Sequence, residues 1–314
     1  MKKLKYMLIL LMILCLVLGM WFASRNKLKE FTKTEFIMDT TCSVTFYGEE
    51  SEIAGKAVFD EIKRIDALMN MYNENSEVSR INNAKSGEEI KVSGDTYYVL
   101  ETALKICEDS NGAFDITVAP LTTLWDFNGE GKIPSQEKID KALENVGYKN
   151  IVLESGNIVK KLKSGTMIDL GGVAKGYAGD KAVEVLKKYN VTGGIIDLGG
   201  NILCFGENPN SKNGKWTVGI QTPFEPTGTY EKTVKISDKA VVTSGTYQRY
   251  FEKSGKLYHH ILNPETGYPE MKEYNSVTVV SDSSLEADCL ATALFVMGEN
   301  EDIVRKYNVE VYFE

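Results

Sequence analysis

The chain is organised around residues 167–188, which read MIDLGGVAKGYAGDKAVEVLKK. The apolar start of this stretch predicts a short strand over residues 167–170, followed by a two-glycine turn and an amphipathic helix. A glycine turn that opens a helix presents free backbone N–H groups and the positive end of the helix dipole, which suits phosphate or another anion. The glycine motifs GxGxxG and GxxxxGK[ST] are both absent, so an ordinary strand-to-helix connection is the alternative interpretation.

The sequence IDLGG at residues 168–172 occurs a second time at residues 196–200. Two strands that end in the same acid-Leu-Gly-Gly turn predict two backbone loops at one end of a sheet. A third copy is missing, and this excludes a solenoid built from many repeats.

Length and composition indicate one large domain or two closely joined ones. The chain has 314 residues, of which 43% are hydrophobic and 25% are charged, and its net charge is −8. These values are typical of a globular protein with a sizeable core. The acidic balance argues against nucleic acid as a partner, because binding a phosphate backbone requires clustered lysines and arginines.

The five cysteines form neither a metal-binding nor a disulfide pattern. Cys15 lies in the N-terminal apolar run, and Cys42, Cys107, Cys204 and Cys289 are widely spaced without a CxxC pair. We therefore expect the last four to be small buried apolar side chains rather than zinc ligands or disulfide partners.

The sequence of residues 1–29 predicts a membrane anchor or a signal segment. Three lysines precede an uncharged run over residues 7–23, which as a helix would span roughly 25 Å against a hydrocarbon core of about 30 Å. Bulky Trp21 disfavours cleavage after Ala23, and bulky Leu14 disfavours a lipoprotein site at the following cysteine. We therefore prefer an uncleaved anchor, with a cleaved signal or a lipoprotein as alternatives. Positive charges flank both ends of the run, so they do not set its orientation.

The remaining body, residues 30–314, shows interspersed strands and helices without a linker. The patterns predict strands at residues 34–47, 216–220, 233–236 and 276–280, and helices at residues 58–69, 95–110, 135–146 and 284–297. Because strands and helices do not alternate regularly, we expect an α+β fold rather than a doubly wound parallel sheet.

The only histidines of the chain, His259 and His260, are adjacent. On a strand they would face opposite ways, so at most one points into a given site. Such a pair is usually structural or exposed. In this chain, however, histidine is the only side chain whose unperturbed pKa lies near neutrality, which makes one of the two a candidate proton acceptor.

Acidic side chains supply the other candidates. Asp115 lies within an apolar run, where an unpaired carboxylate is costly, so it either caps a turn or contacts a ligand. Asp288 and Thr292 are four residues apart in the last predicted helix and share a face with Ala291. A carboxylate and a hydroxyl are hard oxygen ligands that suit Mg²⁺. The alternative is that the threonine hydroxyl bonds to the carbonyl oxygen of Asp288 in an ordinary helix.

In their order and number, the polar and glycine-containing motifs from about Thr34 to the C-terminus resemble those of the ApbE-type FAD:protein FMN transferases. The matching stretches are residues 38–40 (MDT), 72–82 (YNENSEVSRIN), 112–125, 169–177, 199–201, 243–245, 260–267 and 287–292 (ADCLAT). Two positions depart from the family pattern. Asp39 replaces a glycine common in the family, and Asn263 stands where an aspartate often precedes the proline.

The resemblance implies an α+β body of two closely joined subdomains with FAD in the cleft between them and Mg²⁺ on its pyrophosphate. It implies that a threonine or serine hydroxyl of a partner flavoprotein, a subunit of a membrane redox complex, attacks the phosphorus on the riboflavin side and that AMP leaves. By this resemblance His260 stands beside the transferring phosphate, and Asp288, Thr292 and the backbone carbonyl near Gly172 hold the metal. The positions that match the FAD site are Met38, Tyr72, Ala113, Phe114, Asp115, Asp169, Lys175 and Ala291.

The family also implies a location on the extracytoplasmic face of the bacterial cytoplasmic membrane. Two other functions fit the same residues. A metal-dependent FAD pyrophosphatase would use water in place of the protein hydroxyl and give free FMN and AMP. A non-catalytic flavin-binding surface protein would hold FAD without turnover.

Overall fold

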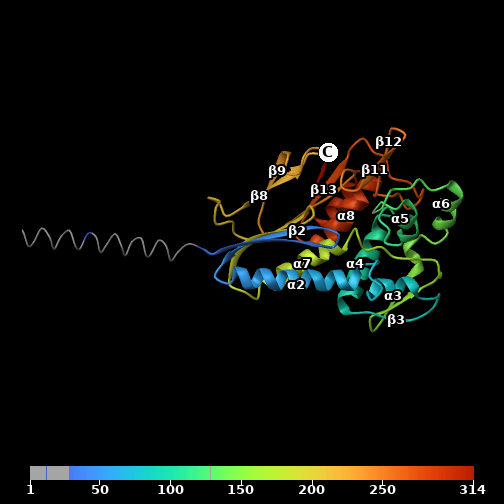
Figure 1. Ribbon diagram of the computed structural model, residues 1–314, viewed down its shortest axis with the longest axis horizontal. Coiled ribbons are helices and arrows are strands. Elements are labelled where there is room, and N and C mark those ends of the chain that lie inside the picture. The colour runs from blue at the N-terminus through green and yellow to red at the C-terminus, as the bar shows by residue number, and fades with distance from the viewer. Residues whose placement is uncertain (1–11, 13–27, 128) are drawn as a thin grey trace, which may run out of the picture.

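The computed structural model describes residues 12, 28–127 and 129–314 of the chain (Figure 1). Apart from Met12, Leu28 and Lys29, the predicted membrane anchor at residues 1–29, with its Cys15, lies outside these residues. Among the helices that are described, none is both long enough and apolar enough to cross a membrane.

The centre of the fold is an antiparallel sheet, which over the described residues has seven strands in the order β1-β2-β6-β7-β10-β13-β14. Its strands are β1 (Glu30–Ile37), β2 (Thr40–Gly48), β6 (Val191–Leu198), β7 (Asn201–Gly206), β10 (Ala240–Gly245), β13 (Ser276–Ser281) and β14 (Glu310–Phe313). Helices are inserted between strand pairs rather than between parallel neighbours, so the predicted α+β class is confirmed.

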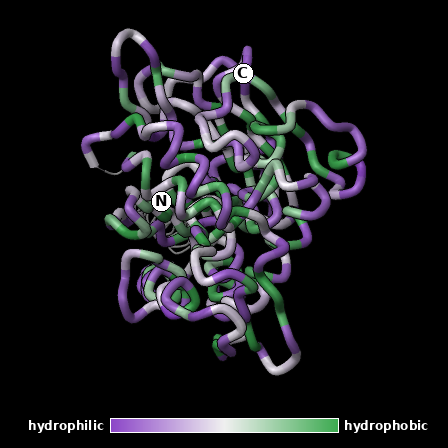
Figure 2. Tube along the Cα trace, turned by 90° about the vertical axis from the view of Figure 1, so that its right-hand side faces the viewer, coloured by the Kyte–Doolittle hydropathy of each residue, from purple (hydrophilic) through white to green (hydrophobic). Residues whose placement is uncertain are grey.

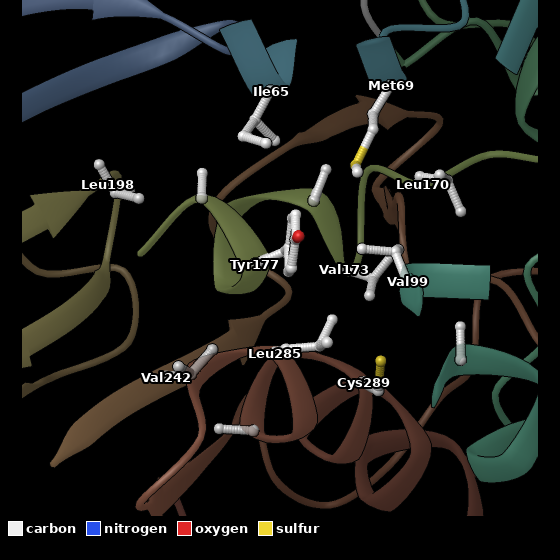
Figure 3. Packing of buried hydrophobic residues seen from close by; sticks show 14 of the residues in the cluster. Ile65, Met69, Val99, Leu170, Val173, Tyr177, Leu198, Val242, Leu285 and Cys289 are labelled. Carbon is white, nitrogen blue, oxygen red and sulfur yellow. The ribbon is translucent and has the colours of Figure 1, made fainter. Parts of the chain in front are cut away.

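Four long helices pack together on one face of this sheet: α2 (Ser51–Met69), α4 (Gly94–Asp109), α7 (Ala174–Leu186) and α8 (Ser284–Met297). Figure 3 shows Val173 and Tyr177 at the start of α7 lying between Ile65 of α2 and Leu285 of α8. All four side chains are buried in the main core. Helix α7 therefore lies between α2 and α8 in this layer.

A glycine sets how closely α7 approaches α8. A Cβ atom on Gly176 would lie 2.3 Å from the carbonyl oxygen of Ser284 and 2.8 Å from the Cβ atom of Asp288. Any larger residue would have to push the two helices apart, so this contact depends on the missing side chain.

The opposite face of the sheet is partly covered by a two-stranded ribbon, β8 (Trp216–Gln221) and β9 (Tyr230–Ile236). Its Trp216 and Ile220 form a second apolar cluster with Val241 and other outward-facing strand residues. Because side chains alternate along a strand, the neighbouring residue Val242 points the other way and belongs to the main core.

The remaining elements surround one end of the molecule. They are α3 (Glu77–Asn83), β3 (Ile90–Lys91), α5 (Ala119–Trp125), α6 (Gln136–Leu143), the 3-10 turn η1 (Tyr148–Asn150), β4 (Ile151–Glu154), β5 (Ile158–Lys161), β11 (Tyr250–Lys253), β12 (Lys256–His259) and α9 (Glu301–Tyr307). A third cluster joins Leu121 and Trp125 to Leu262, and the Trp125 indole donates to the carbonyl oxygen of Gly267 (2.9 Å). Figure 2 shows hydrophilic residues along many of the outer loops.

Most of the predicted helices and strands are confirmed. The helix predicted at residues 284–297 has those bounds, and the strands at residues 216–220, 233–236 and 276–280 are present. The helix predicted at residues 135–146 ends earlier, at Leu143. The four described cysteines are free and buried, as expected.

The single strand predicted at residues 34–47 is wrong. The segment is a hairpin, in which Ile37 of β1 pairs with Thr40 of β2. Met38 and Asp39 form the turn, and both have left-handed backbone angles, with φ of 55° and 60°. Consecutive left-handed residues match the twist of the flanking strands in a two-residue hairpin. Because neither residue is glycine or asparagine, the usual sequence signal for this turn is missing.

The strand predicted at residues 167–170 is also wrong, and the two IDLGG copies differ in structure. Met167 makes one isolated bridge to Val118, and residues 168–170 are irregular before α7 begins. The second copy ends β6 and turns through Gly199 and Gly200 directly into β7. The same five residues thus lead into a helix in one place and a hairpin in the other, because different partners surround them.

Candidate active site

A pocket of about 840 Å³ opens where the β1–β2 turn, the start of α7, one face of α8 and residues 113–127 meet. This volume lies toward the upper end of the range typical of ligand pockets, about 300–1,000 Å³. Both IDLGG turns reach it, through Gly171, Gly172 and Gly199. The two turns therefore lie close together as predicted, but only the second copy ends a strand of the sheet, so the expectation of two strand ends is wrong for the first copy.

Nearly all of the predicted site residues line this pocket. They are Met38, Tyr72, Ala113, Phe114, Asp115, Asp169, Gly172, Lys175, His260, Asp288 and Thr292. Ala291 is the exception, since it is fully buried in the main core and is not among the lining residues. Its place one position before Thr292 turns its methyl group away from the pocket and into the helix packing.

Asp288, Thr292 and Gly172 form one corner of the pocket, which we call the oxygen corner. Oδ2 of Asp288 accepts a hydrogen bond from the backbone N–H of Gly176 (2.9 Å). The hydroxyl of Thr292 pairs with that of Ser244 across the corner (3.0 Å), rather than serving only its own helix. A Cβ atom on Gly172 would lie 3.7 Å from Oγ1 of Thr292, so this backbone lies next to the hydroxyl.

The oxygen corner fits a hard cation. It brings together one carboxylate, two hydroxyls and a backbone segment, which are ligand types that Mg²⁺ accepts. The described residues contain no cluster of three or more histidine, cysteine, aspartate or glutamate side chains placed to hold a metal. A cation here would therefore complete its shell with ligand oxygens and water, as Mg²⁺ commonly does with phosphates.

His260 is the only one of the two histidines that reaches the pocket. The ring of His259, the last residue of β12, is buried on the other side, with its Nε2 2.8 Å from the carbonyl oxygen of Glu270. The Nδ1 atom of His260 lies 3.2 Å from the carbonyl oxygen of Arg249. A carbonyl oxygen only accepts, so Nδ1 carries the hydrogen and Nε2 keeps a lone pair.

The surroundings keep the His260 ring uncharged. Burial, followed by the nearby Arg249 guanidinium, lowers the pKa of His260 from 6.5 to about 3. At neutral pH the side chain is therefore an uncharged imidazole with a lone pair at Nε2, which is the protonation state from which a general base acts.

Asp115 braces the wall of the pocket. Its Oδ1 accepts from the backbone N–H (2.7 Å) and the hydroxyl (2.6 Å) of Thr117, and its Oδ2 accepts from the N–H of Tyr148 (2.7 Å). Burial raises the pKa of this carboxyl, and the hydrogen bonds act in the opposite direction. The turn-forming interpretation of this acid is confirmed by these bonds, and its place in the pocket lining keeps the ligand-contact interpretation as a prediction.

The glycine turn before α7 is already bonded within itself. Asp169 accepts from the N–H of Gly171 (2.8 Å) and from the Thr122 hydroxyl (3.1 Å). The N–H groups of Val173 and Ala174 donate to the carbonyl oxygen of Leu170. The prediction that free N–H groups at this turn receive an anion is therefore wrong for these three amides, and it is wrong for Gly176, which donates to Asp288.

Positive charge at the pocket comes from side chains instead. Lys175 donates to the carbonyl oxygen of Gly171 (3.1 Å), and its Nζ lies 3.9 Å from Oδ2 of Asp288. Arg249 lies across the pocket, with Nη2 3.4 Å from the carbonyl oxygen and 3.5 Å from the carboxylate of Asp39. These two cations lie among six lining aspartates, so a polyanion has few places to bind without a metal.

Asp66, Ser244 and Arg249 also line the pocket, although they are not among the candidate site residues that the sequence predicts. Asp66 lies near the end of α2, where it looks like any solvent-facing acid of an amphipathic helix. Burial raises its pKa. Ser244 lies within the matching stretch 243–245, and Arg249 follows it. Their places in the pocket become clear only in the structure, from the contact of Ser244 with the Thr292 hydroxyl and of Arg249 with His260.

Comparison with known proteins finds a matching family model, similar relatives and similar solved structures. The chain matches the model of the ApbE family over residues 38–313. It is 30% identical over 307 residues to the FAD:protein FMN transferase of Treponema pallidum (strain Nichols), covering 91% of this chain and 84% of the relative. It is 32% identical over 270 residues to the FAD:protein FMN transferase of Klebsiella pneumoniae (strain 342), covering 85% and 83%. The crystal structure of the ApbE protein from Thermotoga maritima superposes with a TM-score of 0.83 at 32% identity, covering 91% of this chain and 94% of that one.

Proposed function

Since this chain belongs to the ApbE family, we propose that it transfers FMN from FAD to a serine or threonine hydroxyl of an acceptor protein, with Mg²⁺ as the metal. The names of its relatives support flavin transfer from FAD to a protein. The metal is inferred from the ligand types in the oxygen corner, and the serine or threonine hydroxyl is carried over from the family resemblance.

The single observation that carries this proposal is the convergence of three chemical groups on one pocket. A neutral imidazole, two cations and the oxygen corner come from segments far apart in the sequence and line the same cavity. Transfer of a phosphoryl group needs positioning and charge neutralisation more than covalent chemistry, and these groups supply both.

The proposed reaction exchanges one phosphorus–oxygen bond for another. The acceptor hydroxyl oxygen attacks the phosphorus on the riboflavin side of FAD, and the bond from that phosphorus to the bridging oxygen breaks. AMP leaves with the bridging oxygen, and FMN stays on the acceptor as a phosphoester. Nε2 of His260 takes the proton of the attacking hydroxyl and returns it to the leaving phosphate or to water.

The charged residues hold the pyrophosphate in place. Lys175 and Arg249 neutralise phosphate oxygens from two sides of the pocket, and the exposed ring of Tyr72 and the ring of Phe114 offer apolar surface to the flavin or adenine. Asp288, Thr292 and the Gly172 carbonyl would hold Mg²⁺, which when bound supplies positive charge for the oxygens that become more negative during transfer.

We also propose where the enzyme acts. The uncharged run at residues 7–23 supports attachment to the cytoplasmic membrane, with the catalytic body on its extracytoplasmic face. The acceptor would then be a flavoprotein subunit of a membrane redox complex.

The test of the proposed function uses the full-length chain in detergent with FAD, Mg²⁺ and a flavoprotein domain that carries an accessible threonine. Release of AMP and the intact mass of the acceptor are followed together. AMP release with a gain of one FMN unit on the acceptor supports the transferase. Free FMN and AMP with every tested acceptor unmodified would support a pyrophosphatase instead, and bound FAD without AMP would support a flavin-binding protein.

A further inference from the structure

Residues 169–172 line the pocket, and the backbone that leads into them from Thr166 belongs to no strand, so its polar groups need other hydrogen-bond partners. The N–H of Asp169 donates to the carbonyl oxygen of Ile116 (2.8 Å), and the side chain of Asn82 supplies the bonds of Ile168. Its Nδ2 donates to the carbonyl oxygen of Ile168 (2.9 Å), and its Oδ1 accepts from the N–H of the same residue (2.7 Å). This amide therefore bonds both polar groups of one residue, as a neighbouring strand would.

A buried lysine fixes the residue that makes these bonds. Lys161 is 1% exposed, and its ammonium donates to the carbonyl oxygens of Asn82 (2.7 Å), Thr166 (2.8 Å) and Ser164 (3.2 Å). An ammonium has three hydrogens, so all of its donors are used. Burial lowers the pKa of Lys161, yet the three carbonyl dipoles compensate for much of the cost of burying it.

We propose that Asn82 and Lys161 are positioning residues, which together clamp the turn at residues 168–172 against the oxygen corner. Neither side chain lines the pocket. Ile168 is followed directly by Asp169, which bonds Gly171, and Gly172 lies beside Thr292. The clamp therefore acts through only a few backbone bonds on the segment that carries the Gly172 carbonyl.

The clamp fixes the orientation of the backbone at residues 168–172, and it is not needed to keep this segment attached to the core. The side chains of Ile168 and Leu170 are buried in the main core and would hold the segment nearby without it. Without Asn82, however, the backbone N–H and carbonyl of Ile168 would be left unpaired, and the turn would shift to find new partners. A displacement of about 1 Å at a reacting site costs on the order of 10²-fold in rate.

The test compares Asn82→Leu with Asn300→Leu in the full-length chain. Oδ1 of Asn300 caps α9 by accepting from the N–H groups of Asp302 (3.1 Å) and Ile303 (3.0 Å), outside the pocket. Each substitution thus removes an asparagine that satisfies two backbone groups. We expect both variants to unfold at lower temperature. We expect only Asn82→Leu to bind FAD about tenfold more weakly by flavin fluorescence and to release AMP on the order of 10²-fold more slowly with Mg²⁺.

Hydrogen exchange gives a readout that does not depend on FAD. The amides of residues 168–174 should exchange faster in Asn82→Leu, and those of residues 302–304 faster in Asn300→Leu. If Asn82→Leu does not fold, the same measurements are made on Asn82→Asp. This variant keeps the acceptor for the Ile168 N–H but loses the donor to the Ile168 carbonyl oxygen.

This inference rests on the proposed function for the identity of the ligand, but the two can fail separately. If the wild-type chain does not bind FAD, the proposed function fails. Unchanged exchange at residues 168–174 in Asn82→Leu would overturn the clamp, whatever the ligand is. If the wild type binds and turns over FAD while Asn82→Leu matches it in both, the two residues only stabilise the fold and the positioning role is wrong.

Discussion

The contacts of the His260 imidazole favour a role in proton transfer. Its Nδ1 hydrogen is committed to the carbonyl oxygen of Arg249, and its Nε2 faces a pocket that also holds two cations. Removing the ring should therefore affect proton transfer more than binding, since the phosphates have other partners.

We expect His260→Asn to lower the rate of FMN transfer by about 10²–10⁴-fold, while FAD binding weakens much less. The measurements are the rate of AMP release under saturating FAD and the FAD dissociation constant. His259→Asn is the matched control, because that ring bonds Glu270 outside the pocket, and it should retain activity at some loss of stability. Equal losses of rate and affinity in His260→Asn would make the histidine a binding residue.

The titration of the histidines is a second prediction at this scale. Burial lowers the pKa of both rings, and that of His260 lies at about 3 against an ordinary 6.5. Between these values the unfolded chain binds a proton that the folded chain does not. The contribution of His260 to stability is therefore present above pH 6.5 and is lost as the pH falls toward 3.

Since the chain has only two histidines, NMR of the imidazole carbons can follow both in the protein without FAD. We expect the His260 signal to stay at its neutral position between pH 8 and pH 5. A shift centred near pH 6.5 would show that the ring titrates normally and would contradict the neutral-base assignment.

Asp288 is the only carboxylate of the oxygen corner, so the metal response should depend on it. We expect Asp288→Asn to abolish Mg²⁺-dependent AMP release while leaving the fold intact, because an asparagine oxygen still accepts from the N–H of Gly176. Asp282→Asn is the control, since that acid lies just before α8 and pairs with Lys239 at the surface. Unchanged turnover with Mg²⁺ in Asp288→Asn would refute the metal assignment.

At the scale of elements, the close packing of α7 on α8 brings Lys175 to Asp288. We expect Gly176→Ala to destabilise the protein by about 1–3 kcal/mol, because the new methyl group would overlap backbone of α8 that cannot move away. Urea unfolding measures the loss. Gly94→Ala at the start of α4 is the control, since its Cβ would meet only Asn157, at 3.9 Å. A Gly176→Ala variant as stable as the control would contradict the packing.

The same scale shows where sequence patterns were sufficient. Apolar residues at helical spacing predict α2 and α4, and each of these helices buries that face. Helix α8 is predicted as well, but it is buried on nearly all sides rather than on one face. The Met38-Asp39 turn and the irregular backbone at Ile168 leave no local pattern in the sequence, each for its own reason. One uses left-handed angles without glycine, and the other takes its hydrogen bonds from Asn82, which is 86 residues away.

At the scale of the molecule, the pocket is built from segments that no local pattern connects. Asp39 and Arg249 meet across 210 residues, and Asp288 meets Gly176 across 112. Spacing within one helix could suggest Asp288 with Thr292, but Ser244, the hydrogen-bond partner of Thr292, comes from β10. The resemblance of ordered motifs selected most of the lining residues. It could not show that Ala291 turns into the core, nor that Asp115 is used in a turn.

The most direct test of the central claim is a crystal structure of the protein with FAD and Mn²⁺ in place of Mg²⁺, in which anomalous scattering locates the metal. We predict one manganese ion bound by Asp288 and Thr292, with the FAD pyrophosphate between Lys175 and Nε2 of His260. FAD bound outside this pocket, or manganese bound away from Asp288, would contradict the account.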